Sequence, residues 1–304
     1  MLPFAGGEPF SLDETFGCGQ IFRWRRTLRG TWRGPYGAVA LEVQAVPGGV
    51  AVTWRGAGSA PPAGDIWRFL GLDFPLGRAR EILGADAPVS RAMDATPGLR
   101  ILRQDPWDCV SAFVCAQWSS VAKIERSTGW MAREWGETVP FPDGEVIHLC
   151  PRAGRLAALA PDALRPAGLG YRCRYVVGTA HAVAAGDVDL DALRGAEYPD
   201  ALAALLRLPG FGRKVADCVL LFALDQPCAC PVDVWVRRAF HDWYAEELAS
   251  RLPSEADALT PREHRALVQF AWDRWGDLAG YAQQYLFHAR RGAKQHLAVP
   301  EPRS

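Results

Sequence analysis

The spacing of the apolar residues changes along this 304-residue chain, and that change constrains the fold more than any other feature. In the first part, apolar residues alternate with smaller or polar ones on both sides of a Pro-Gly-Gly turn at residues 47–49. The alternating residues are Val39, Leu41, Val43, Val50, Val52 and Trp54. A period of two is typical of strands with one buried face. We therefore expect antiparallel strands between residues 10 and 60, with a β-hairpin at this turn.

From about residue 100 the apolar residues follow a helical period instead. Pro106 is a typical first residue of a helix, and an apolar stretch at residues 107–115 follows it. Later segments share this period: 201–208, 213–224, 262–272 and 277–291. The sequence predicts an α+β protein with an N-terminal antiparallel β-sheet domain (residues 1–98), a mostly α-helical domain (residues 99–292) and a tail (residues 293–304). Residues 56–64, rich in Gly, Ala and Pro, are expected to form a loop.

The composition is that of a globular protein, with 49% apolar and 22% charged residues. The formal net charge of zero argues against a surface that coats nucleic acid with positive charge all over. Backbone N–H groups at helix N-termini still hold phosphates, so a neutral chain can bind DNA through local groups. The chain shows no run of about 18 apolar residues and no signal-peptide pattern, and we expect a soluble protein inside the cell.

The eight cysteines do not have the spacing of a metal-binding ladder. One residue separates Cys228 from Cys230, whereas zinc and iron–sulfur motifs usually have at least two. We therefore expect free thiols, no metal ion and no iron–sulfur cluster.

The most informative motif is Leu-Pro-Gly-Phe-Gly-Arg-Lys at residues 208–214, between an apolar helical stretch and an amphipathic one. Gly210 and Gly212 permit positive φ and expose backbone N–H groups at a helix N-terminus, where a phosphate can bind. A plain helix–helix turn is the alternative. Asp233, in Pro-Val-Asp-Val-Trp, follows Lys214 by nineteen residues. One helix and a short loop can bring this lysine and aspartate into one cleft, and a surface salt bridge is the alternative.

These two motifs resemble those of the helix-hairpin-helix DNA glycosylases. In that family a lysine at the position of Lys214 marks the bifunctional members, whose amine attacks C1′ of the damaged nucleotide. A lysine amine is almost fully protonated near neutral pH, so this chemistry needs a pocket that favours the neutral form. The resemblance implies that Asp233 stabilises the oxocarbenium charge on the sugar and moves protons afterwards. It also implies an imine, strand nicking by β-elimination, and no cofactor.

Five segments spread over roughly residues 11–291 resemble the 8-oxoguanine DNA glycosylase/AP lyases of this superfamily. They lie at residues 18–24, 102–106, 168–175, 214–218 and 280–287. Oxidised guanine carries a hydrogen on N7, so an acceptor placed there selects the lesion over guanine. The resemblance assigns that acceptor to the backbone carbonyl of Gly19, the Watson–Crick edge to Gln283, and the two faces of the flipped base to Phe287 and Cys218. Taken singly, Gln283 is equally a solvated helix residue, and the other two side chains are equally core residues.

Base flipping leaves a gap in the duplex and an orphaned partner base. By the same resemblance Tyr171 is a wedge beside that base and Arg172 donates hydrogen bonds to it, with core packing and a surface arginine as the alternative. The sequence departs from the family at Trp118 and Lys123, where the family has asparagine and arginine. Tryptophan fills a gap by stacking but lacks the amide's hydrogen bonds to cytosine, and lysine lacks a planar fork. We therefore expect a relaxed preference for cytosine opposite the lesion. Trp235 also departs, because eukaryotic members carry a phosphate-contacting histidine there.

Other functions stay open. An alkylated-base DNA glycosylase on the same scaffold works without a lysine nucleophile, so Lys214 argues against it. A relative of endonuclease III or adenine glycosylase usually carries an iron–sulfur loop after the aspartate, and no cysteine follows Cys230. A non-catalytic lesion-binding DNA module would have lost Lys214 or Asp233. We expect the partner to be double-stranded DNA containing oxidised guanine. We also expect a monomer that works in the cytoplasm with the nucleoid, or in the nucleus if the source is eukaryotic.

Overall fold

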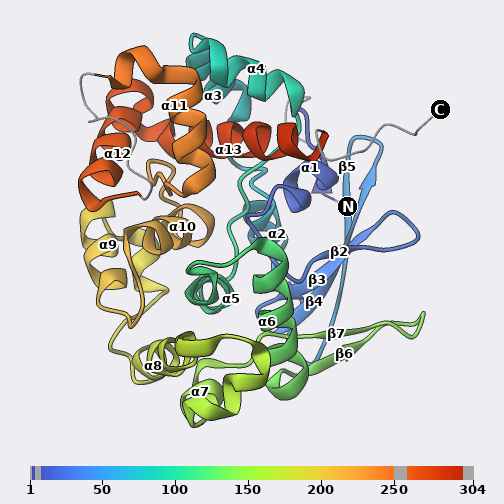
Figure 1. Ribbon diagram of the computed structural model, residues 1–304. Coiled ribbons are helices and arrows are strands. Elements are labelled where there is room, and N and C mark those ends of the chain that lie inside the picture. The colour runs from blue at the N-terminus through green and yellow to red at the C-terminus, as the bar shows by residue number, and fades with distance from the viewer. Residues whose placement is uncertain (1, 4–7, 250–258, 297–304) are drawn as a thin grey trace, which may run out of the picture.

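The computed structural model describes residues 2–3, 8–249 and 259–296, and consists of a sheet beside a larger helical part (Figure 1). The antiparallel sheet contains β1 (Leu2–Pro3), β2 (Arg25–Arg26), β3 (Trp32–Tyr36), β4 (Val39–Val46) and β5 (Gly49–Arg55). The strand order is β1-β5-β4-β3-β2. The α+β class predicted from the sequence, with the sheet first and the helices after it, is confirmed.

The predicted hairpin consists of β4 and β5. Val46 pairs with Gly49, which leaves a turn of two residues between the strands. Gly48 in this turn has φ +76°, a conformation that glycine adopts without strain. Leu41 and Val43, two of the alternating residues, are fully buried. The period of two therefore identified the buried face along β4 and at the start of β5, whereas Trp54 near the end of β5 is 40% exposed.

Between β1 and β2 the chain forms helix α1 (Leu12–Gly17), whereas strands were expected throughout residues 10–60. The side chain of Ser11 caps this helix, because it accepts a hydrogen bond from the backbone N–H of Glu14. Phe16 on this helix stacks 4.5 Å from the ring of Trp24, between ring centroids. Phe16 also stacks 5.4 Å from the ring of Trp32 on β3, so the helix packs against the sheet through an aromatic contact.

Residues 56–62 form a loop, which matches most of the loop predicted at residues 56–64. Three helices lie between this loop and residue 98. They are α2 (Ala63–Phe69), α3 (Leu76–Leu83) and α4 (Ala87–Ala95). Phe69 of α2 packs against Trp24 beside the sheet. In contrast, the buried residues of α3 and α4 belong to the core of the helical part. That core therefore begins before the domain boundary predicted between residues 98 and 99, which stays a prediction.

The helical part holds most of the remaining elements. They are α5 (Pro106–Phe113), η1 (Val114–Ala116), α6 (Val121–Trp135), α7 (Ala153–Ala157), η2 (Pro161–Ala167), η3 (Gly170–Arg172), α8 (Cys173–Ala184), η4 (Ala192–Gly195), α9 (Tyr198–Leu206), α10 (Arg213–Ala223), α11 (Val234–Leu248), α12 (Pro261–Trp275), η5 (Gly276–Leu278) and α13 (Ala279–His296). Helix α13 continues into the tail predicted at residues 293–304, of which residues 297–304 lie outside the described residues. Within the described residues, no helix is long and apolar enough to cross a membrane.

A short hairpin that was not predicted interrupts the helical part. It consists of β6 (Thr138–Pro140) and β7 (Val146–His148), and it extends alongside the sheet (Figure 1). Strands of three residues are too short to show a clear period of two. This hairpin therefore left no signal in the sequence pattern.

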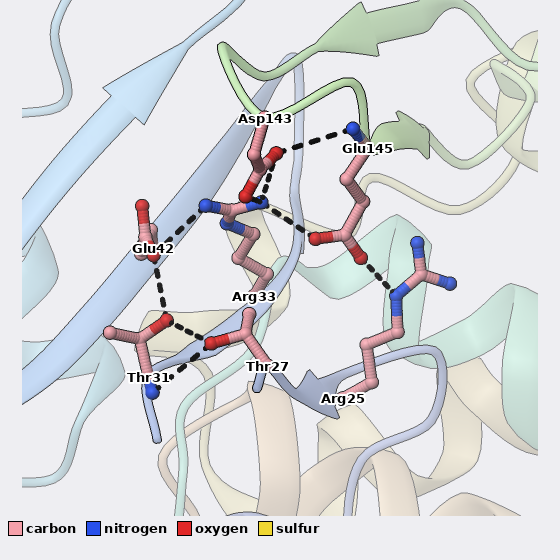
Figure 2. Close-up of polar contacts among 7 residues, drawn as sticks. All are labelled: Arg25, Thr27, Thr31, Arg33, Glu42, Asp143 and Glu145. Carbon is pink, nitrogen blue, oxygen red and sulfur yellow. Dashed lines mark hydrogen bonds and ion pairs between the residues drawn. The ribbon is translucent and has the colours of Figure 1, made fainter. Parts of the chain in front are cut away.

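Arg33 of β3 ties this hairpin to the sheet (Figure 2). Its side chain is only 3% exposed. Its Nη1 donates to Asp143 at 2.9 Å and to Glu145 at 2.6 Å, and its Nη2 donates to Glu42 at 3.1 Å. The guanidinium also lies 4.1 Å from the ring centroid of Phe141. The buried cation thus has acidic partners on both the sheet and the hairpin, as a buried charge requires.

Replacing Arg33 with methionine should lower the free energy of unfolding by about 2 to 3 kcal/mol, because the partly buried carboxylates of Glu42 and Glu145 lose their shared cation. Urea denaturation measures this change. Arg78→Met is a matched control, since Arg78 pairs with Glu81 on an exposed surface, and we expect it to cost less than about 0.5 kcal/mol. Equal small effects for both variants would show that the Arg33 cluster contributes no more than a surface pair.

Candidate active site

The predicted glycine-rich motif forms the turn between α9 and α10. Gly210 has φ +81°, and a Cβ there would lie 2.6 Å from the ring of Tyr175 and 2.8 Å from Nε2 of Gln117. Any larger residue would strain the backbone and displace both neighbours. Gly212 is the N-cap of α10, and no side chain caps the first N–H groups of this helix. These donors suit a phosphate.

A buried carboxylate holds the two helices of this turn together. Asp217 of α10 is fully buried. It accepts hydrogen bonds from the hydroxyl of Tyr198 on α9, at 2.6 Å, and from Nε of Arg213, at 3.2 Å. Burial raises the pKa of Asp217 to about 6, and the charge of Arg213 opposes the rise. This network fixes the start of α10, where Lys214 follows Arg213.

Lys214 and Asp233 line the same pocket, as the spacing of the two motifs predicts. The Nζ of Lys214 lies 5.6 Å from the ring centroid of Phe113. Asp233 is the N-cap of α11, and its Oδ1 accepts hydrogen bonds from the backbone N–H groups of Trp235 and Val236, both at 2.9 Å. The cap fixes the carboxylate through one oxygen only. The second oxygen of Asp233 is therefore outside the cap and suited to chemistry in the pocket.

The pocket has a volume of about 50 Å³. Its lining includes all six residues that the sequence assigned to catalysis and base binding: Gly19, Lys214, Cys218, Asp233, Gln283 and Phe287. Four further lining residues were not predicted: Phe113, Phe222, Pro231 and Gln284. The apolar members of this second group look like core residues in a single sequence, and only the second glutamine of the Gln-Gln pair carried a polar signal. A space this small holds water and not a purine, so side chains must move before a base can enter.

Each candidate base-binding residue has a property that suits a planar ligand. Gly19 has φ +92°, a backbone conformation that favours glycine. Oε1 of Gln283 is buried and has no hydrogen-bond partner among the described residues. Such an acceptor is unfavourable unless a ligand donates to it. Burial raises the pKa of Cys218 to about 12, so the thiol stays neutral and offers a packing surface. Phe287 is half-buried beside it in the lining of the pocket.

Two exposed aromatic residues lie close to the glycine-rich turn between α9 and α10. Trp118 is 93% exposed and Tyr171 is 53% exposed, which is unusual for side chains of this size. Trp118 also has φ +49°, a conformation that residues other than glycine rarely adopt. The neighbouring Gln117 donates a hydrogen bond from Nε2 to the carbonyl oxygen of Gly210. The loop that carries Trp118 is therefore attached to the glycine-rich turn. Lys123 is half-buried in the first turn of α6, just beyond this loop.

Arg172 is not part of this exposed surface. It is 4% exposed. Its Nε donates to the carbonyl oxygen of Leu169 at 2.9 Å, and its Nη1 donates to those of Cys115 and Gln117 at 2.9 and 2.8 Å. The guanidinium thus holds the backbone that leads into Trp118. The predicted hydrogen bonds from Arg172 to an orphaned base need a rearrangement of these contacts, and they stay a prediction.

No three His, Cys, Asp or Glu side chains of the described residues are grouped closely enough to hold a metal ion. All eight cysteines are free thiols.

Comparison with known proteins places these features in a family. The model of the 8-oxoguanine DNA glycosylase N-terminal domain matches residues 2–110. N-glycosylase/DNA lyase OGG1 of Arabidopsis thaliana is 32% identical, over 94% of this chain and 79% of the relative. The probable N-glycosylase/DNA lyase of Methanothermobacter thermautotrophicus is 33% identical, over 66% of each chain. The apo crystal structure of Clostridium acetobutylicum 8-oxoguanine glycosylase/lyase is 25% identical, has a TM-score of 0.80, and is matched over 92% of this chain and 93% of that one.

The glycine-rich turn between two helices, followed by a lysine and an aspartate in one pocket, defines a helix-hairpin-helix DNA glycosylase. Within that class, the chain belongs to the 8-oxoguanine DNA glycosylase family.

We expect Arg172→Met to lower the free energy of unfolding by about 2 to 4 kcal/mol, because three backbone carbonyl oxygens lose a charged donor. We also expect faster amide hydrogen exchange at residues 115–120, since the loop loses its anchor. Arg174→Met is the control, because Arg174 is the exposed arginine two residues along. Native exchange rates in Arg172→Met would show that the guanidinium does not hold the Trp118 loop.

Proposed function

We propose that this protein is a bifunctional DNA glycosylase and AP lyase that flips 8-oxoguanine out of duplex DNA and excises it in base excision repair, with Lys214 as nucleophile and Asp233 as the assisting carboxylate. Membership of the family supports the activity. One observation supports the residues: a lysine amine and a fixed carboxylate share a pocket with a buried, unpartnered amide oxygen on Gln283. The first two groups supply the chemistry, and the third suits the edge of a purine.

The two catalytic residues divide the reaction between them. The neutral amine of Lys214 attacks C1′ as the C1′–N9 bond breaks, and the bonding electron pair leaves with the base. Asp233 stabilises the positive charge that develops on the sugar, and it accepts the proton that the lysine nitrogen loses once its bond to C1′ has formed. Opening of the sugar ring gives an imine. Removal of the acidified C2′ proton then expels the 3′ phosphate by β-elimination and nicks the strand.

The base-binding residues suit 8-oxoguanine in particular. Guanine derivatives present N–H donors along the Watson–Crick edge, which match the free Oε1 of Gln283. The backbone carbonyl of Gly19 accepts the N7 hydrogen that distinguishes 8-oxoguanine from guanine. Cys218 and Phe287 cover the two faces of the base. Because the free pocket is small, we expect the half-buried Phe287 to move when the base enters.

The partner is double-stranded DNA that contains oxidised guanine. The uncapped N–H groups around Gly210 and Gly212 hold a backbone phosphate. Trp118 fills the space that the flipped base leaves, Tyr171 wedges beside the orphaned base, and Lys123 contributes a cation nearby. We propose a monomer that repairs DNA inside the cell, in the cytoplasm with the nucleoid or in a eukaryotic nucleus.

Borohydride reduction tests the covalent step. Native protein mixed with a duplex containing 8-oxoguanine should form a reduced, covalent protein–DNA complex, because the imine between Lys214 and C1′ is reducible. Lys214→Ala should form none, and Asp233→Asn should form it far more slowly. An unmodified guanine duplex and a duplex with an alkylated base serve as substrate controls.

Three results would contradict this assignment. Native protein that releases alkylated bases without trapping would point to the alkylated-base glycosylase. Tight binding of the lesion duplex with neither base release nor trapping would point to a non-catalytic lesion-binding module. Equal trapping by Lys214→Ala would place the nucleophile elsewhere.

The preference for the base opposite the lesion follows from Trp118. An indole ring stacks on any base, whereas the asparagine of the relatives can hydrogen-bond to cytosine. We expect equal excision rates for 8-oxoguanine opposite C, A, G and T. Trp118→Ala should slow all four reactions roughly tenfold, because base–aromatic stacking is worth about 1 to 3 kcal/mol. A strong preference of native protein for cytosine would overturn this prediction. Lys123→Ala is the control that separates lost stacking from a lost charge.

A further inference from the structure

Helix α13 carries an arginine one turn beyond the residues that line the pocket. Gln283 and Phe287 both line it and are four residues apart. Residues at this spacing lie on the same face of a helix. Arg291 is the next residue at this spacing, and it lies within the described part of α13. The helix face that supplies two base-binding residues therefore ends in an arginine.

The guanidinium of Arg291 reaches Gly19. A Cβ built on Gly19 would lie 2.5 Å from Nη1 of Arg291 and 3.7 Å from Cε1 of Phe287. The guanidinium and the phenyl ring thus approach the same side of this glycine. Arg291 is half-buried. A cation consequently stands beside the backbone segment that is to accept the N7 hydrogen of the lesion.

Arg291 forms no ion pair with the described residues. Among the described residues no carboxylate lies within ion-pair distance of it, whereas the adjacent Arg290 pairs with Asp242 at 2.6 Å. Glu125 on α6 is within the electrostatic influence of Arg291: burial raises the pKa of Glu125, and the charge of Arg291 opposes the rise. Arg291 therefore keeps hydrogen-bond donors for a ligand that binds at Gly19.

The chemistry of the substrate gives these donors a target. N7 of 8-oxoguanine lies between two carbonyl groups, with O8 on one side and O6 on the other. A donor next to Gly19 is thus close to one of these oxygens when N7–H faces the glycine carbonyl. When the C1′–N9 bond breaks, its electron pair passes to N9 and spreads onto O8 and O6. The base leaves as an anion and then takes up a proton to become neutral 8-oxoguanine.

We propose that Arg291 is a further catalytic residue, whose guanidinium donates to the purine oxygen beside N7 and stabilises the negative charge of the departing base. Preorganised donors aimed at a developing oxyanion are among the largest contributions to catalysis. This role rests on the proposed excision of 8-oxoguanine. It also extends the substrate requirement, because a lesion must carry a carbonyl oxygen next to the N7 hydrogen to benefit from Arg291.

Two substrates separate this role from other roles of a cation near DNA. Arg291→Gln should excise 8-oxoguanine roughly 100-fold more slowly in single turnovers, since removal of one such donor typically costs about that factor. The same variant should nick a duplex with a preformed abasic site at the native rate, because that substrate has no base to release. Arg291→Lys keeps the charge and should recover part of the excision rate. Arg91→Gln removes an exposed arginine on α4 and should leave both reactions unchanged.

The possible failures are distinguishable. Excision at the native rate by Arg291→Gln would overturn the proposal. Equal slowing of excision and abasic nicking would also overturn it, because Arg291 would then act on a phosphate or on the fold, and thermal unfolding separates these two. If native protein nicks abasic DNA but does not release 8-oxoguanine, the proposed substrate is wrong and the role of Arg291 falls with it.

Discussion

The glycine-rich turn between α9 and α10 approaches two other elements at Gly210 so closely that no side chain fits there. The ring of Tyr175 packs against it from α8, and Gln117 bonds its carbonyl oxygen from the loop before α6. Lys214 follows four residues later, held in place by the buried Asp217 network. The close contact at Gly210 and the Asp217 network therefore position three features: the turn that suits a phosphate, Lys214, and the loop that carries Trp118.

The arginines of this chain do not all lie on the surface that DNA can reach. Three of those described are buried and stabilise the fold. Arg33 joins the sheet to the β6–β7 hairpin, Arg172 holds the Trp118 loop, and Arg100 donates to Glu8 and to three backbone carbonyl oxygens. Buried charges of this kind contribute little to a surface potential. Because the formal net charge is zero, we expect contact with the duplex to depend on backbone N–H groups and aromatic stacking as much as on charge.

The sequence predicted those features that depend on local pattern. The period of two predicted the β4–β5 hairpin. The spacing between Lys214 and Asp233 predicted that both residues line one pocket. Two kinds of feature were missed. Helix α1 lies where strands were expected, and its cap at Ser11 is a local signal that the period of two did not take into account. The other features depend on tertiary contacts. Arg172 and Arg291 look alike as solvated arginines in the sequence. Only the folded chain shows that the first bonds buried carbonyl oxygens and the second stands over Gly19.

The two sides of the site distinguish lesion from partner base by different physics. On the lesion side, hydrogen-bonding groups are buried and directional: the unpartnered oxygen of Gln283 and the positive-φ backbone at Gly19 accept a defined pattern of donors. On the duplex side, the exposed Trp118 and Tyr171 offer planar surfaces with little directional demand. An unsatisfied buried acceptor penalises a wrong ligand strongly, whereas stacking tolerates any base. In the proposed reaction, selection therefore takes place after the base has left the duplex, inside a pocket too small to hold it without rearrangement. The surface that opens the duplex then has no need to be selective.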